Sequence, residues 1–185
     1  MAIQSALTQP PGLIKAVIAG YPMTDLASSW YTTASSTKSP KGALQMNISI
    51  FKSHIAAMEP GKIITNDLPT KRIPLAITIL QHGLYRHLLG NSDSLYPLKL
   101  VDAKKGDEKV PFLFFYHGKV DSFVPCEQTE EFLRRWIRKF GTGSAVGIFV
   151  EGQDHGFDQH ATLDTPWLRG GLKEMNESIQ RQNLS

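Results

Sequence analysis

The sequence predicts an α/β protein in which a small, mostly parallel sheet has helices on its faces. The clearest strand is VPFLFFYHG, residues 110–118, because a short and nearly continuous apolar run is typical of a strand buried on both sides. An amphipathic helix over 128–140 leads into a second strand over 144–152, and a closing helix is expected over about 165–181. Strands and helices that alternate with short links favour parallel neighbours in one sheet.

Two more elements are expected at the start of the chain. Residues 2–8 have the composition of the last turns of a helix, which Pro10, Pro11 and Gly12 end. Residues 13–22, LIKAVIAGYP, form another short apolar run that stops at Gly-Tyr-Pro. This run predicts a further buried parallel strand.

The long segment between these strands differs in character. Residues 24–98 show no strand pattern, but apolar residues recur at helical spacing over 47–58 and over 75–89. So many residues inserted after a strand predict a helical cap or lid. The expected organisation is therefore a core of residues 1–23 and 99–185 with a cap inserted into it.

Composition narrows the class of protein. Of the 185 residues, 41% are hydrophobic and 20% charged, as in ordinary globular proteins, and the net charge is only +3. Basic residues are scattered and no run approaches the roughly 18 apolar residues that span a bilayer, so we expect neither nucleic acid nor a membrane span. Cys126 is the single cysteine, which excludes an internal disulfide, and we expect no metal, no cofactor and a cytoplasmic location.

The candidate chemistry lies in two loops that leave strands. Asp121 follows the strand at 110–118, and His155 follows the strand at 144–152. Active groups collect at the carboxyl ends of parallel strands, where a carboxylate can fix the tautomer of a histidine and leave its other nitrogen free to take a proton. The sequence therefore predicts an Asp121–His155 acid/base pair, although a turn-forming aspartate and a surface histidine stay an open alternative.

Other titratable residues have weaker claims. Asp154 is expected to order the turn around His155, and His117 to support its loop. Cys126 begins a helix, where a thiolate could be stabilised, but we rank it below the Asp–His pair. No partner pattern accompanies the four other histidines, which are His54, His82, His87 and His160.

Three segments carry a resemblance to a known family. AVIAGYPMTD, PFLFFYHGKVDSFVP and VGIFVEGQDHGFD are similar to the C-terminal half of a capped α/β-hydrolase of the lipase/esterase type, in the hormone-sensitive-lipase-like branch with many fungal members. The resemblance implies that Asp121 is the acid and His155 the base of a triad, and that residues 21–25 lead into the cap.

The nucleophile of that family has no counterpart here. The family places its serine in a G-x-S-x-G elbow and part of its oxyanion hole in an upstream HGG loop, and neither motif occurs in the 185 residues. The resemblance therefore implies a truncated α/β-hydrolase fold without its nucleophile-elbow half. The strand at 13–20 would then be an apolar sheet edge, which predicts a homodimer that covers it.

Without the nucleophilic serine of the G-x-S-x-G elbow, the Asp121–His155 pair cannot form an acyl-enzyme. We predict acid/base chemistry, such as isomerisation, cyclisation or elimination, on a small hydrophobic organic molecule, for instance a secondary metabolite. The alternatives are an ester hydrolase whose serine-bearing half is missing or supplied in trans, and a non-catalytic binding or partner subunit. Expected substrate-binding residues are aromatic, unless they only pack the cap: Tyr21, Trp30, Tyr31, Phe51, Tyr85, Phe123 and Phe157.

Overall fold

The computed structural model describes residues 2–61 and 69–184. The chain divides into two compact units, one of residues 1–25 and 92–185, the other of residues 26–91. The predicted cap of residues 24–98 includes residues 62–68, which lie outside the described residues. That the second unit acts as a lid stays a prediction.

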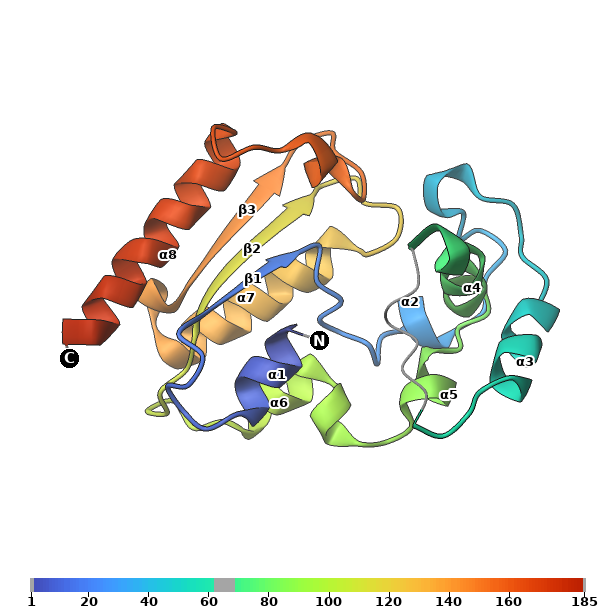
Figure 1. Ribbon diagram of the computed structural model, residues 1–185, viewed down its shortest axis with the longest axis horizontal. Helices are drawn as coiled ribbons and strands as arrows, with labels where there is room; N and C mark the ends of the chain where they lie inside the picture. Colours follow the sequence, from blue (N-terminus) through green and yellow to red (C-terminus); the bar gives the residue numbers. More distant parts are fainter. Residues whose placement is uncertain (1, 62–68, 185) are drawn as a thin grey trace. The chain divides into compact units, whose positions relative to one another are not determined.

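The first unit is built on a three-stranded parallel sheet, which confirms the predicted fold class. Its strands are β1 (Ala16–Gly20), β2 (Phe112–Gly118) and β3 (Ala145–Val150), in the order β1-β2-β3 (Figure 1). The central strand β2 is buried on both faces because Phe112 to Phe115 alternate between two apolar layers. All three carboxyl ends therefore meet at one edge of the sheet.

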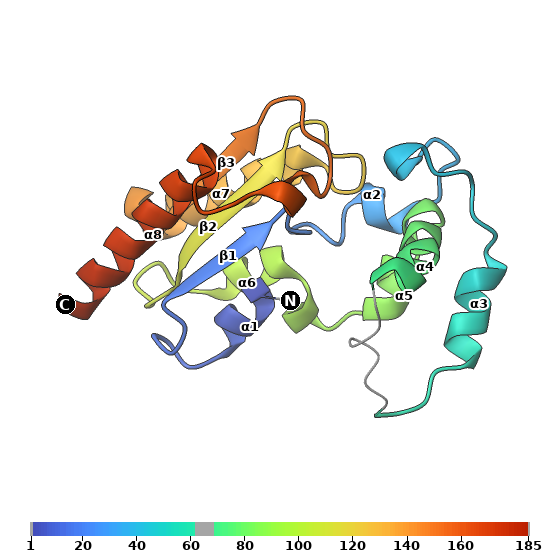
Figure 2. The ribbon, with the colours of Figure 1, turned by 45° about the horizontal axis from the view of Figure 1, so that its top comes forward.

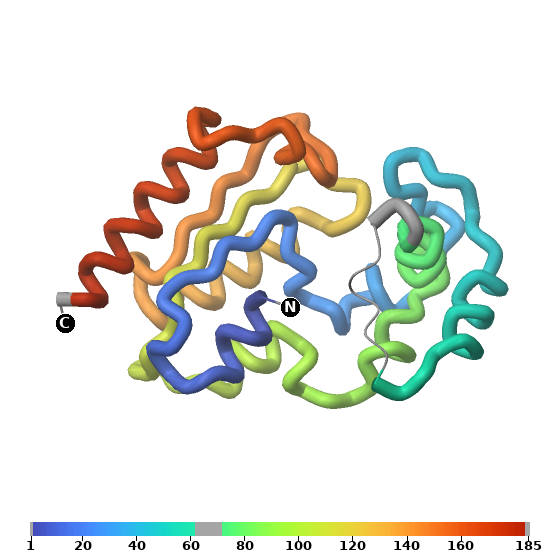
Figure 3. Tube along the Cα trace, viewed as in Figure 1, coloured from blue at the N-terminus to red at the C-terminus, as the bar shows by residue number. Residues whose placement is uncertain are grey.

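One face of the sheet carries the main core. The helices α1 (Ala2–Thr8), α6 (Pro97–Ala103) and α7 (Cys126–Phe140) supply its apolar side chains, and Figure 3 shows α1 lying beside α6. Trp136 of α7 is fully buried, and its indole N–H donates to the Ser144 carbonyl over 3.3 Å. The core cluster contains Ile3, Ala6, Leu7, Val17, Val101, Leu113, Phe115, Phe132, Leu133, Trp136 and Ala145.

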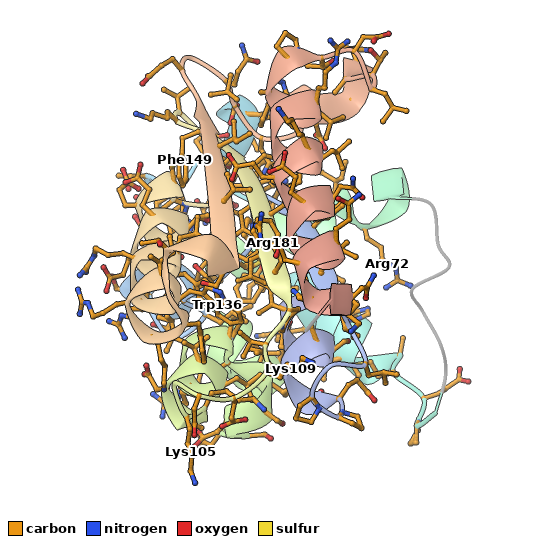
Figure 4. The ribbon with its side chains drawn as sticks, turned by 90° about the vertical axis from the view of Figure 1, so that its left-hand side faces the viewer. Arg72, Lys105, Lys109, Trp136, Phe149 and Arg181 are labelled. Atoms are coloured by element: carbon orange, nitrogen blue, oxygen red, sulfur yellow. The ribbon has the colours of Figure 1, made fainter. Side chains whose placement is uncertain are left out.

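The opposite face is covered by α8 (Pro166–Leu184), which packs on β2 and β3 (Figure 4). Gly171 makes this close approach possible, because a Cβ there would lie 2.1 Å from the ring of Phe114. Phe114 is itself fully buried, so its ring has little room to move away. The neighbouring Gly170 has open space around it.

This pair of glycines gives a matched stability test. We expect Gly171→Ala to lower the free energy of unfolding by about 1–3 kcal/mol, because the extra methyl overpacks the α8 interface. Gly170→Ala should instead raise it by about 0.5–1 kcal/mol, since alanine is the better helix former. Urea unfolding of the two variants measures both changes, and equal effects would contradict the packing at Gly171.

The strand β1 forms one edge of the sheet (Figure 2). Because α8 packs on β2 and β3, the side chain of Ile18 is left 44% exposed, and Leu13 just before the strand is 65% exposed. The edge that the sequence predicts to be apolar is therefore accessible on its outer side within the described residues.

Residues 26–91 form a helical unit with its own core. Its elements are α2 (Ser29–Thr32), the 3-10 turn η1 (Pro40–Gly42), α3 (Ser49–Ala56), α4 (Pro69–Gln81) and α5 (Tyr85–Leu89). Inside this unit the buried Gln81 side chain donates to the carbonyls of Lys38 and Leu44 and accepts from the Met46 N–H, which ties the loop before α3 to α4.

The helical pattern over 75–89 belongs to two helices, α4 and α5, and is not one continuous helix. It is broken at Gly83, whose φ of 65° ends α4, and a Cβ at this position would lie 2.6 Å from the backbone of Thr33. The remaining short turns are η2 (Asp93–Leu95), η3 (Thr142–Ser144) and η4 (Phe157–His160). Across residues 2–61 and 69–184, no helix has both the length and the apolarity to cross a membrane.

Candidate active site

The loops that follow β2 and β3 interlock at the carboxyl edge of the sheet. Gly118 and Val150 end the two strands side by side, and backbone bonds join Lys119 N to Val150 O and Val120 N to Gln153 O. Gly118 is required for this approach, because a Cβ there would lie 2.2 Å from the Gln153 carbonyl oxygen. The parallel register therefore brings the two predicted loops into direct contact.

This contact places Asp121 against His155. The imidazole Nδ1 lies 2.9 Å from Asp121 Oδ2 and 3.2 Å from Oδ1, so the neutral ring carries its proton on Nδ1 and donates it to the carboxylate. The Asp121 side chain is fully buried, whereas that of His155 is 27% exposed. Within the described part of the chain, Nε2 makes no hydrogen bond and is available to take a proton.

The protein holds Asp121 as a carboxylate. Its Oδ1 accepts the backbone N–H groups of Phe123 and Val124, each over 2.8 Å, and its Oδ2 lies 3.3 Å from His117 Nε2. Burial alone would raise the pKa of Asp121, but the hydrogen bonds from His117, His155 and the loop backbone hold that pKa well below its ordinary value. Asp121 therefore stays ionised beside His155.

His117 supports this loop from inside the protein. It is fully buried, its Nε2 lies 3.0 Å from the Val124 carbonyl, and its Nδ1 lies 2.9 Å from Thr129 Oγ1. Both ring nitrogens thus have protein partners, so His117 has a supporting position and no free nitrogen for a substrate.

A second carboxylate, Asp154, ties the two loops together. Its Oδ1 accepts from the N–H and hydroxyl of Ser122 in one loop and from the His155 N–H in the other, over 2.7–2.9 Å. Burial opposes ionisation, yet these donors lower the pKa of Asp154. The contacts are those expected of a residue that orders the turn around His155.

Two of the predicted aromatic residues lie against the imidazole ring. The ring centroid of His155 is 4.0 Å from that of Tyr21 and 4.9 Å from that of Phe123. Phe157 lies further along the loop and packs with Tyr116 and Trp167. That any of these rings binds substrate stays a prediction.

The other predicted aromatic residues belong to the unit of residues 26–91. There Tyr31 and Phe51 are core residues, 0% and 6% exposed, and Tyr31 packs edge-on against Tyr85 at 5.1 Å. The ring of Trp30 lies 5.5 Å from the Lys38 ammonium. These contacts account for the four residues as packing groups of the unit, and their role toward a substrate stays a prediction.

Cys126 does not provide a thiolate. Its thiol is buried, and burial together with the nearby Glu130 and Glu127 carboxylates raises its pKa to about 11. The start of α7 therefore fails to offset burial, and the thiol stays protonated at neutral pH. No group of three histidine, cysteine or acidic side chains that could hold a metal is found among the described residues.

Sequence reasoning missed two members of the site, Tyr116 and Asp158. The Asp158 carboxylate accepts the phenol of Tyr21 over 3.2 Å and that of Tyr116 over 2.7 Å. The available signal was a third acid, Asp158, just after His155 in a loop already expected to carry chemistry. Its partners could not be read from the sequence because they lie on β2 and just after β1.

Comparison with known proteins agrees with this geometry at the level of fold. No protein-family model matches the chain. Over 180 residues it is 26% identical to the probable carboxylesterase M8 of Phoma sp. (strain ATCC 20986 / MF5453). The aligned region covers 92% of this chain and 53% of that protein. A protein of unknown function from Staphylococcus aureus subsp. aureus Mu50 superposes with a TM-score of 0.65 at 15% identity, covering 96% of this chain and 60% of the other.

The three-stranded parallel sheet with helices on both faces thus has the architecture of part of an α/β-hydrolase fold. The chain is similar to a carboxylesterase and spans about half the length of that relative. Assignment to the hormone-sensitive-lipase-like branch stays a prediction.

Proposed function

We propose that this protein is an enzyme that uses Asp121 and His155 for general acid/base chemistry, such as isomerisation, cyclisation or elimination, on a small hydrophobic organic molecule. The observation that carries the proposal is the 2.9 Å bond between His155 Nδ1 and the buried Asp121 carboxylate. This bond supports the proposal because it fixes the tautomer of a side chain that is 27% exposed, so that Nε2 would be free to act as a base. The single, buried Cys126 suits a reducing, cytoplasmic location.

The proposed reaction is a proton transfer in two steps. Nε2 of His155 takes a proton from an acidic C–H or O–H of the substrate, and the imidazolium that forms is stabilised by ionised Asp121. The same nitrogen then returns the proton to a different atom of the substrate. No covalent bond between protein and substrate is needed, and a positioned base of this kind contributes about 10²- to 10⁴-fold to the rate.

Ester hydrolysis is the second candidate, favoured by the similarity to a probable carboxylesterase. Because no G-x-S-x-G motif occurs in the 185 residues, this function would need a serine from outside them. His155 and Asp121 would then serve that serine as base and acid.

One experiment separates the two candidates. Small hydrophobic carbonyl compounds are incubated with the protein in D2O, and deuterium incorporation is followed by mass spectrometry, while p-nitrophenyl butyrate hydrolysis is followed in parallel. Deuterium incorporation that disappears in His155→Ala is expected from the proposed function. Hydrolysis that depends on His155, with no deuterium incorporation, would favour the esterase.

The exposed apolar edge at β1 supports a further part of the proposal, a two-fold homodimer through this edge. Leu13 and Ile18 are 65% and 44% exposed, and an open, apolar strand edge favours pairing with another chain. We expect light scattering at micromolar concentration to give twice the chain mass of 20.6 kDa. Ile18→Lys should shift the protein to monomer. Leu163→Lys, at an exposed aliphatic residue away from β1, should not. A monomeric wild type would contradict the dimer.

A further inference from the structure

Asp158 connects the ends of all three strands. It lies in η4 after β3, and its two carboxylate oxygens accept one phenol from Tyr21, just after β1, and another from Tyr116 of β2. Gly20 permits this arrangement, because a Cβ there would lie 2.6 Å from the Tyr116 ring. The cluster is therefore built from the sheet register, in which Gly20 and Tyr116 are partners.

Tyr21 is held in a backbone conformation that side chains seldom adopt. Its φ is 36°, in the left-handed region that favours glycine. A tyrosine at such a position needs compensating contacts. Its hydroxyl bonds Asp158, its N–H donates to the Tyr116 carbonyl over 2.7 Å, and its ring packs at 4.0 Å on the imidazole of His155.

We infer that Tyr21, Tyr116 and Asp158 form a positioning cluster that fixes the orientation of the His155 ring, so that Nδ1 stays on Asp121 and Nε2 faces outward. The inference rests on the proposed function, in which His155 is the base. The positioning role needs no contact between these residues and substrate, and the expected contact of Tyr21 with substrate is a separate prediction. Their effect passes through the Tyr21 ring, which lies against one side of the imidazole and limits its rotation.

The charges in the cluster agree with this assignment. Burial and the Asp158 carboxylate raise the pKa of Tyr21 to about 12. The same two causes also raise the pKa of Tyr116 above its ordinary value. Both phenols therefore stay protonated at neutral pH and keep donating to Asp158. Removal of the carboxylate would release both hydroxyls, and Tyr21 would lose an anchor that holds its unfavourable backbone conformation.

The test is the tautomer of His155, measured by 15N NMR of the imidazole nitrogens at a pH where the ring is neutral. The wild type is expected to hold the Nδ1–H form. In Tyr21→Leu and Asp158→Ala we expect the ratio of Nδ1–H to Nε2–H to fall severalfold, because a ring that can turn more freely keeps Nδ1 on the Asp121 carboxylate for less of the time. Tyr21→Phe, which keeps the ring and removes only the anchor, should give a smaller fall in the same direction.

Two controls remove matched groups elsewhere in the same unit. Tyr96→Phe removes the hydroxyl of another buried tyrosine, and Asp164→Ala removes a carboxylate that is 91% exposed. Both should keep the wild-type tautomer ratio. The amide NMR spectrum shows whether each variant is folded. If Tyr21→Leu or Asp158→Ala does not fold, the conclusion is drawn from Tyr21→Phe. An unchanged ratio in the folded cluster variants would overturn the inference.

The NMR readout needs no substrate, so it separates this inference from the proposed function. A tautomer ratio that depends on Asp158, in a protein without His155-dependent turnover, would retain the positioning cluster and reject the acid/base function. Where turnover is measured, Asp158→Ala should lower kcat and leave KM within about twofold, because it changes the orientation of the base and removes no expected substrate contact.

Discussion

Replacement of His155 by alanine is expected to lower kcat for the deuterium-exchange or isomerisation reaction by about 10²- to 10⁴-fold, with little change in KM. The physical reason is that the His155 side chain is partly exposed and its Nδ1 bonds the buried Asp121 carboxylate, which leaves Nε2 to take the proton. The reaction should be followed by mass spectrometry over a series of substrate concentrations, so that kcat and KM are obtained separately.

His160 offers a matched control for this variant. It lies in the turn η4 of the same loop region and is exposed, so His160→Ala removes an imidazole without touching the Asp121 contact. We expect this control to keep the wild-type rate. Equal losses in both variants would mean that the loop tolerates no truncation, and a full rate in His155→Ala would remove His155 from the mechanism.

The Asp121–His155 pair could be predicted from sequence because both residues directly follow strands that the sequence identifies. Apolar runs identify β2 and β3, and a parallel sheet brings the residues that follow them to one edge, so Asp121 and His155 could be paired before their 2.9 Å contact was seen. The same reasoning predicts that Asp154 orders the turn around His155. Each of these inferences needs only the order of elements and the direction of the strands.

The positioning contacts could not be predicted because they depend on register and on one unusual backbone angle. Tyr21, whose φ is 36°, bonds Asp158, and Tyr116 bonds the same carboxylate beside Gly20, where a Cβ would lie 2.6 Å from its ring. Gly83 is a parallel case in the second unit. A glycine within a helical pattern costs only about 1 kcal/mol, so the pattern alone favours one continuous helix. In the structure α4 ends before Gly83, whose positive φ and contact with the Thr33 backbone both suit a glycine.

Asp121→Asn is expected to lower both stability and turnover. With its amide oxygen left on the Phe123 and Val124 N–H groups, the amide nitrogen would face His155 Nδ1 and His117 Nε2, which now meet Oδ2. His155 would then have to present a lone pair on Nδ1 and carry its proton on Nε2, where it cannot accept one from a substrate. We expect kcat to fall about 10²- to 10⁴-fold.

The stability effect of this substitution should depend on pH, and the sign follows from the low pKa of Asp121 in the folded protein. An unfolded aspartate titrates near pH 3.9, so the ionised form stabilises the fold fully above about pH 5, and this stabilisation is lost as the pH falls toward the lower folded pKa. Urea unfolding at pH 7 should show Asp121→Asn less stable than wild type by about 1.5–3 kcal/mol, the size of a buried hydrogen bond to a charged group.

At pH 3 the difference in unfolding free energy between wild type and Asp121→Asn should be smaller, because the wild type has lost part of the stabilisation that the variant never had. Asp164→Asn is the control, since its 91% exposed side chain should change stability by less than about 0.5 kcal/mol at either pH. A difference that stays constant between pH 7 and pH 3 would show that the Asp121 carboxylate stabilises the loop through shape alone. Its ionisation would then not be coupled to folding, and the electrostatic support of the His155 imidazolium would lose its main structural argument.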